Sequence, residues 1–155
     1  MTRISKVFSA VSPLMLLFST TGQAADIRIR GTLINSCILT LSTEGRLALS
    51  GDATVFGSEE TTGLPAIMAV VAVGGTPTVS FTAPTVDAPS GMPAGAQTAI
   101  RYTSLGGSNQ PYTSSASSSS SVRLLDTFTV HGRVTSLNGF QAGTYVVTTV
   151  ATCQQ

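Results

Sequence analysis

The chain has 155 residues, of which 42% are hydrophobic and only 10% are charged, with a formal net charge of +1. This length fits one domain of ordinary size. The few charges argue against nucleic-acid binding, which needs clustered positive charge to displace counterions. With 6% aromatic residues and no Trp, the core must consist mainly of Val, Ile, Leu and Ala.

Residues 1–24 have the pattern of a secretory signal peptide. Arg3 and Lys6 supply positive charge, residues 7–18 are mostly apolar, and the segment ends with a small residue at Ala24. The apolar stretch is too short and too interrupted for a transmembrane anchor. We therefore expect cleavage after Ala24, no membrane insertion, and one β-sandwich domain over residues 25–155 that passes through the periplasm to the cell surface or the medium.

Short apolar runs predict strands along the mature chain, and no long segment has the apolar periodicity of a capped helix. In chain order, the predicted strands are residues 27–33, 37–41, 46–49, 67–73, 76–81, 99–103, 122–125, 127–134 and 144–153. We expect 122–125 and 127–134 to form one strand with a bulge near Asp126. The number and spacing of the runs predict an all-β, antiparallel sandwich.

Two segments are expected to be loops. Three prolines interrupt residues 83–95, and proline cannot donate to a central ladder. Residues 113–121 are almost entirely serine and threonine, and such a segment buries too little apolar area to offset its ordering entropy. The second segment is predicted to be a flexible surface loop, with a glycosylated or ligand-facing loop as the alternative.

Cys37 and Cys153 are the two cysteines of the chain. In an oxidising compartment they most simply form one disulfide, although two free thiols or a bond to another chain remain alternatives. A bridge between them would close a loop over most of the mature chain. The chain-entropy treatment gives such a loop about 5 kcal/mol.

The sequence offers no recognisable catalytic, metal or cofactor site. His131 is the only histidine, and strand alternation places it on a solvated face with Thr129 and Arg133. Zinc needs several Cys, His or carboxylate ligands, and two distant cysteines with one histidine do not form such a set. Glu59 and Glu60 are adjacent, which is typical of a solvated loop pair. We therefore predict that the protein is not an enzyme and binds no cofactor.

The C-terminal strand is the clearest of the predicted elements. Its alternation puts Tyr145, Val147, Thr149, Ala151 and Cys153 on one face. A sandwich that ends on this strand, with no further strand beside it, leaves an edge open to strand addition from another chain.

Both ends of the mature chain resemble a known family. The stretch from Ile29 to Leu39 resembles the opening of a pilin, in which an apolar-x-Gly-x-apolar strand runs into a Cys. The stretch from Phe140 to Val150 looks like the closing strand of bacterial chaperone–usher pilins and of the related spore coat protein U group. The resemblance implies an immunoglobulin-like sandwich that lacks its last strand. It also implies a periplasmic chaperone, an usher and like or related pilin subunits as partners.

Under this resemblance, the last strand faces the chaperone or the neighbouring subunit through Tyr145, Val147, Thr149 and Ala151. The candidate donor segment presents the alternating residues Ile27, Ile29, Gly31 and Leu33. Two features differ from the common pilin pattern. Common pilins pair the first Cys with one in the next strand or two, whereas the other Cys here is near the C-terminus, and the N-terminal extension is short. The expected function is a structural or adhesive subunit of a surface fibre. The alternative is a stand-alone exported sandwich that closes on itself and binds a small ligand or glycan through its loops.

Overall fold

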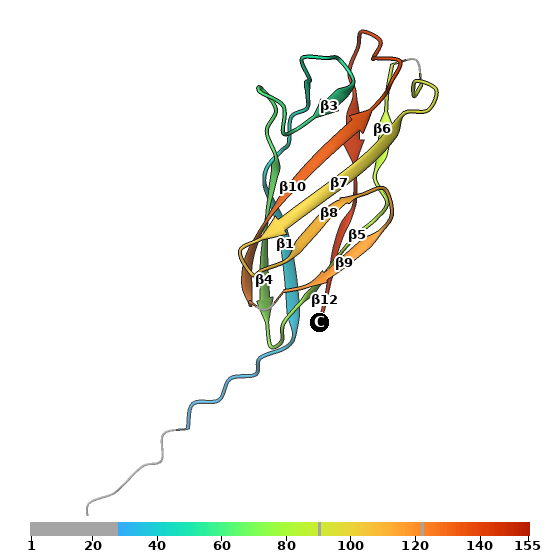
Figure 1. Ribbon diagram of the computed structural model, residues 1–155. Coiled ribbons are helices and arrows are strands. Elements are labelled where there is room, and N and C mark those ends of the chain that lie inside the picture. The colour runs from blue at the N-terminus through green and yellow to red at the C-terminus, as the bar shows by residue number, and fades with distance from the viewer. Residues whose placement is uncertain (1–27, 90, 122) are drawn as a thin grey trace, which may run out of the picture. The chain divides into compact units, whose positions relative to one another are not determined.

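A computed structural model describes residues 28–89, 91–121 and 123–155 (Figure 1). The predicted signal peptide and Ile27 lie outside the described residues. Residues 32–155 form one compact unit. Residues 28–33, the described part of the first predicted strand, are not in a strand, so that prediction is wrong for them.

The described residues form antiparallel strands and no helix, which confirms the predicted all-β class. The larger sheet contains, in spatial order, β1 (Ser36–Thr43), β4 (Ala66–Val73), β10 (Leu125–Thr135), β3 (Val55–Gly57) and β2 (Ala48–Leu49). Two further strands extend it beside β10, namely β7 (Gln97–Ser104) and β8 (Asn109–Thr113).

The second layer consists of two short antiparallel groups. The first has the order β12 (Ala151–Gln154), β5 (Thr78–Phe81) and β9 (Ser117–Ser120). The second pairs β11 (Val146–Thr148) with β6 (Thr85–Asp87). Because β5 leads into β6 and β11 leads into β12, the two groups follow each other along one ribbon (Figure 1).

The two layers share one apolar core. Phe81 of β5 stacks on Tyr102 of β7 with ring centroids 4.4 Å apart, and Phe128 of β10 lies 5.9 Å from Tyr102. The cluster contains Met68, Val70, Val79, Phe81, Ile100, Tyr102 and Phe128. Every second residue of each strand points between the two layers, so the period-two pattern of these strands produces the core.

The predicted strand 144–153 is interrupted, which corrects the expectation of one long strand. β11 ends at Thr148 and β12 begins at Ala151. Thr82 spans the gap: its N–H donates to the Val150 carbonyl (3.0 Å), and its hydroxyl accepts from the Val150 N–H (3.0 Å). The Thr149 hydroxyl donates to the Thr82 carbonyl (2.8 Å). These bonds satisfy the backbone where the regular ladder stops.

The serine-rich segment is not a loop throughout, so that prediction is wrong as well. Residues Ser117–Ser120 form β9 and pair with β5 in a regular antiparallel register. The edge of β5 supplies backbone partners, and these partners override the poor local propensity of a serine run. Within 83–95, residues Thr85–Asp87 likewise form a strand because β11 pairs with them. The prolines flank this strand and do not lie within it.

β10 runs through Asp126 without the bulge that the sequence predicts. Its register against β4 is continuous from Leu125 to Val130. The Asp126 side chain is only 1% exposed and accepts hydrogen bonds from the Gly106 N–H, the Thr127 N–H and the Ser121 hydroxyl, each 2.8 Å long. Burial by itself would raise the pKa of Asp126, but hydrogen bonds from two serines and two backbone N–H groups outweigh burial and hold the pKa below the usual 3.8.

The substitution Asp126→Asn is expected to lower the free energy of unfolding by about 2 kcal/mol at neutral pH, because charge-assisted hydrogen bonds are lost. The pKa of Asp126 is lower in the folded than in the unfolded chain. Its stabilisation is therefore complete above the unfolded value and disappears as the pH falls through the folded value. Urea unfolding at several pH values should show that the difference in the free energy of unfolding between wild type and variant becomes smaller below about pH 4. A gap that stays constant with pH would contradict this account.

Candidate functional site

One wall of an open groove is formed by the segment that follows β1. The register of β1 against β4 shifts between Leu41 and Thr43, which marks a bulge. Beyond the bulge, residues 44–47 leave the sheet and form one isolated bridge, in which Arg46 and Leu64 exchange backbone hydrogen bonds of 2.8 Å. The segment stays beside the start of β4, because a Cβ on Gly45 would lie 3.1 Å from the Ala66 N atom, and its other side lines the groove opposite residues 143–147.

The opposite wall is formed by Tyr145 and β11. The Tyr145 ring is buried and contacts Phe56 and Phe140 edge-on, with centroids 5.4 and 5.6 Å away. Its hydroxyl donates to the Gln141 carbonyl and accepts from the Gln141 N–H, both at 3.1 Å. These contacts fix the ring and hold the start of β11 in place.

Between the two walls lies a cavity of about 500 Å³, which we call the open groove. Its walls are residues 44–47 and 143–147, and its floor includes Phe56, Ser58, Ala66, Ile100, Val130 and Gly132. The floor is mostly apolar. Gly132 helps to keep the groove open, because a Cβ there would lie 3.4 Å from Val147 Cγ1 and 3.9 Å from Leu47 Cδ2.

The strand edges beside the open groove are unpaired among the described residues. β11 pairs only with β6, and β12 pairs only with β5. The carbonyls of Thr148 and Val150 point toward β6 and Thr82, where they accept hydrogen bonds. Because successive residues of a strand direct their N–H and C=O groups to opposite edges, those of Val147 and Thr149 point to the open edge.

The structure places the residues predicted for the last strand along one inward face. Tyr145 is buried, Val147, Thr149, Ala151 and Cys153 are half-buried, and the residues between them are exposed. The predicted disulfide between Cys37 and Cys153 is confirmed, with a Cα–Cα distance of 5.9 Å.

The described members of the candidate donor segment are exposed. Ile29 and Leu33 are 94% and 76% exposed, and Gly31 is exposed too. Ile27 lies outside the described residues.

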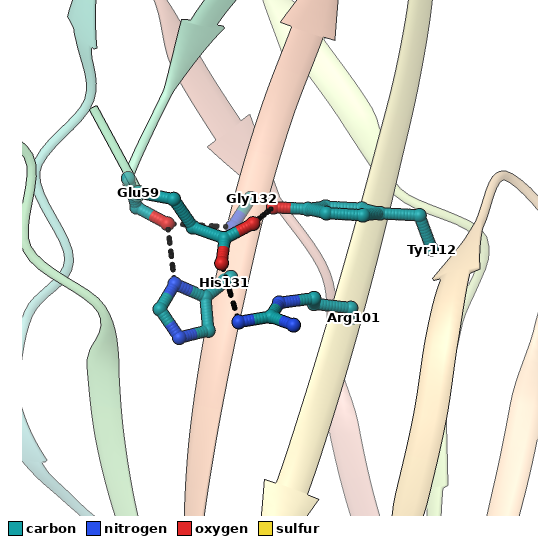
Figure 2. Close-up of polar contacts among 6 residues, drawn as sticks. Glu59, Arg101, Tyr112, His131 and Gly132 are labelled. Atoms are coloured by element: carbon teal, nitrogen blue, oxygen red, sulfur yellow. Dashed lines mark hydrogen bonds and ion pairs between the residues drawn. The ribbon is translucent and has the colours of Figure 1, made fainter.

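A polar cluster on the larger sheet was not anticipated from the sequence (Figure 2). Glu59 forms an ion pair with Arg101 and accepts a hydrogen bond from the Tyr112 hydroxyl (2.5 Å). Ser58 lies 3.2 Å from His131 Nδ1 and accepts from the Gly132 N–H (3.1 Å). Glu59 is an exposed loop residue, as expected, but it has partners that the sequence did not indicate. His131 is half-buried and not fully solvated.

The cluster holds the loop after β3 against β7, β8 and β10. Burial lowers the pKa of His131, and the Arg101 charge lowers it too, against an opposing effect of Glu59. Burial, together with the hydrogen bond to Glu59, raises the pKa of Tyr112. Local alternation could not reveal this cluster, because Glu59 and its ion-pair partner Arg101 lie on different elements and are distant in sequence.

Within the described ranges, no three His, Cys, Asp or Glu side chains are grouped so that they could hold a metal ion. The same residues contain no helix long and apolar enough to cross a membrane. Comparisons with protein-family models, with curated proteins and with solved structures give no match.

Proposed function

We propose that this chain is a structural or adhesive subunit of a surface fibre, assembled by strand insertion into the open groove. The observation that carries the proposal is the apolar cavity of about 500 Å³ between residues 44–47 and 143–147, beside a strand edge that has no partner strand among the described residues. In this view the fold is an immunoglobulin-like sandwich that lacks its last strand. The missing strand comes from another polypeptide.

An extended apolar segment matches both features of the open groove. Its backbone would pair with the free N–H and C=O groups of Val147 and Thr149, and its alternate side chains would fill the cavity. The candidate donor residues Ile27, Ile29, Gly31 and Leu33 alternate in this way. A periplasmic chaperone would fill the open groove before assembly, and an usher would export the subunit. The disulfide is compatible with such an oxidising compartment.

A small-ligand site is the second candidate. The cavity volume of about 500 Å³ falls within the 300–1,000 Å³ that is common for small-molecule sites. Such a protein would bind an apolar ligand between the two walls and would need no partner chain.

A synthetic peptide with the sequence of residues 25–36 should stabilise the chain 25–155. At a peptide concentration about 100 times the dissociation constant, the free energy of unfolding should rise by about 2.7 kcal/mol. Thermal and urea unfolding with increasing peptide concentration would measure this effect. A matched peptide carrying Ile27→Asp, Ile29→Asp and Leu33→Asp should give no stabilisation, because charged side chains cannot enter the apolar cavity.

Two protein variants link the effect to the open groove. Gly132→Ala adds only a methyl group, whose Cβ makes an ordinary contact with Val147, and should still bind the peptide. Gly132→Leu projects a larger side chain between Val147 and Leu47 and should abolish binding. Lack of stabilisation by the peptide, together with saturable one-to-one binding of the apolar dye ANS that Gly132→Leu removes, would favour the small-ligand candidate instead.

A further inference from the structure

The disulfide closes one end of the space between the first and last strands. Cys37 lies near the start of β1 and Cys153 near the end of β12, and their Cα atoms are 5.9 Å apart. A strand inserted between two others needs two strand spacings, about 9.6 Å. No strand can therefore pass between β1 and β12 at this bridge. Figure 1 shows β12 ending beside the beginning of β1.

The inward face of β1 becomes uncovered with distance from the bridge. Cys37 and Leu39 are half-buried and pack against the core cluster. Leu41, the next residue on the same face, is 57% exposed. The cavity itself begins only beyond Leu41, at residues 44–47. The space is thus closed at the disulfide and open at the bulge.

We propose that the Cys37–Cys153 bridge is a stop that sets how far an inserted strand can run and in which register it binds. This inference rests on the proposed function and specifies the ligand of the same groove. The part of the edge that precedes β12, from Tyr145 to Thr149, accommodates about five residues, or about 17 Å. A strand of that length directs two or three side chains into the cavity.

The stop has a consequence for the candidate donor. Its alternating residues, from Ile27 to Leu33, span seven positions, or about 24 Å in a strand. The whole segment is longer than the stretch from Tyr145 to Thr149, so only part of it can pair there. The bridge therefore selects short donors and excludes registers in which the donor would extend along Cys153.

Amide hydrogen exchange, followed residue by residue by NMR, can locate the end of the inserted strand. The chain 25–155 with its disulfide intact is measured with and without the synthetic 25–36 peptide. At about 100 times the dissociation constant, exchange of the Val147 and Thr149 amides should slow about 100-fold, because only the peptide-free fraction exchanges. Exchange of the Cys153 amide should not change.

Each other outcome overturns a defined part of the inference. Protection that extends to Cys153 would remove the stop but leave strand insertion intact. Protection at none of these amides would remove strand insertion as well. In a Cys37→Ala, Cys153→Ala double variant the protection should extend to position 153, and a variant that remains protected only at Val147 and Thr149 would contradict a role for the bridge. If this variant does not fold, the wild-type measurement decides by itself.

Discussion

Replacement of both Cys37 and Cys153 by alanine is expected to lower the free energy of unfolding by about 5 kcal/mol, the largest loss that we predict. The bridge joins residues 116 positions apart, and the chain-entropy treatment assigns about 5 kcal/mol to a loop of that size. The bond restricts the conformations that the unfolded chain can adopt, and this restriction is lost in the variant. The folded chain loses few contacts when the two sulfur atoms are removed.

Urea unfolding of the double variant at neutral pH would measure this effect. Wild-type protein unfolded in the presence of a thiol reductant is the matched control, because it breaks the same bridge without changing a residue. The two losses should agree. A loss of less than about 1 kcal/mol in both would show that the reduced chain retains the closed ends without the bond.

Tyr145→Ala is expected to be the second largest perturbation, lowering the free energy of unfolding by about 3–5 kcal/mol. The ring is buried against Phe56 and Phe140 and forms part of the wall of the open groove. Its removal leaves a cavity next to an existing one, so the groove loses its shape as well as its packing. We expect peptide binding to be lost and, under the proposed export, accumulation in the periplasm to be abolished.

Tyr145→Phe separates the ring from its hydroxyl. This variant keeps the contacts with Phe56 and Phe140 but loses the two hydrogen bonds to the Gln141 backbone. The expected loss is about 1 kcal/mol, with peptide binding retained. Equal losses for the two variants would show that the hydroxyl, and not the ring, holds the wall.

Features that depend on local alternation could be predicted from the sequence. The inward face from Tyr145 to Cys153 follows from period-two spacing, which survives the interruption at Thr149 and Val150. β4 was predicted almost to the residue because a continuous apolar run of this length suits a central strand. The prediction of the disulfide needed only the two cysteines and the expectation of an oxidising compartment.

Features that depend on a distant partner could not be predicted. Ser117–Ser120 form a strand only because β5 offers a free edge, and β6 exists only because β11 pairs with it. Glu59 finds Arg101 and Tyr112 through the approach of a loop to a sheet face. In each case the partners are more than 30 positions apart, and local propensity contains no information about them.

The sequence by itself determined that this is an antiparallel β protein closed by one disulfide, because alternation and cysteine count are written into the chain. Only the tertiary structure decided that the space between the two ends is shut at Cys37 and Cys153 and open at Leu41. The opening coincides with a bulge: the register of β1 against β4 shifts between Leu41 and Thr43, and residues 44–47, which line the groove, follow directly. A bulge changes the direction of a strand without changing its composition, and so its effect appears only when the partner strands are in place.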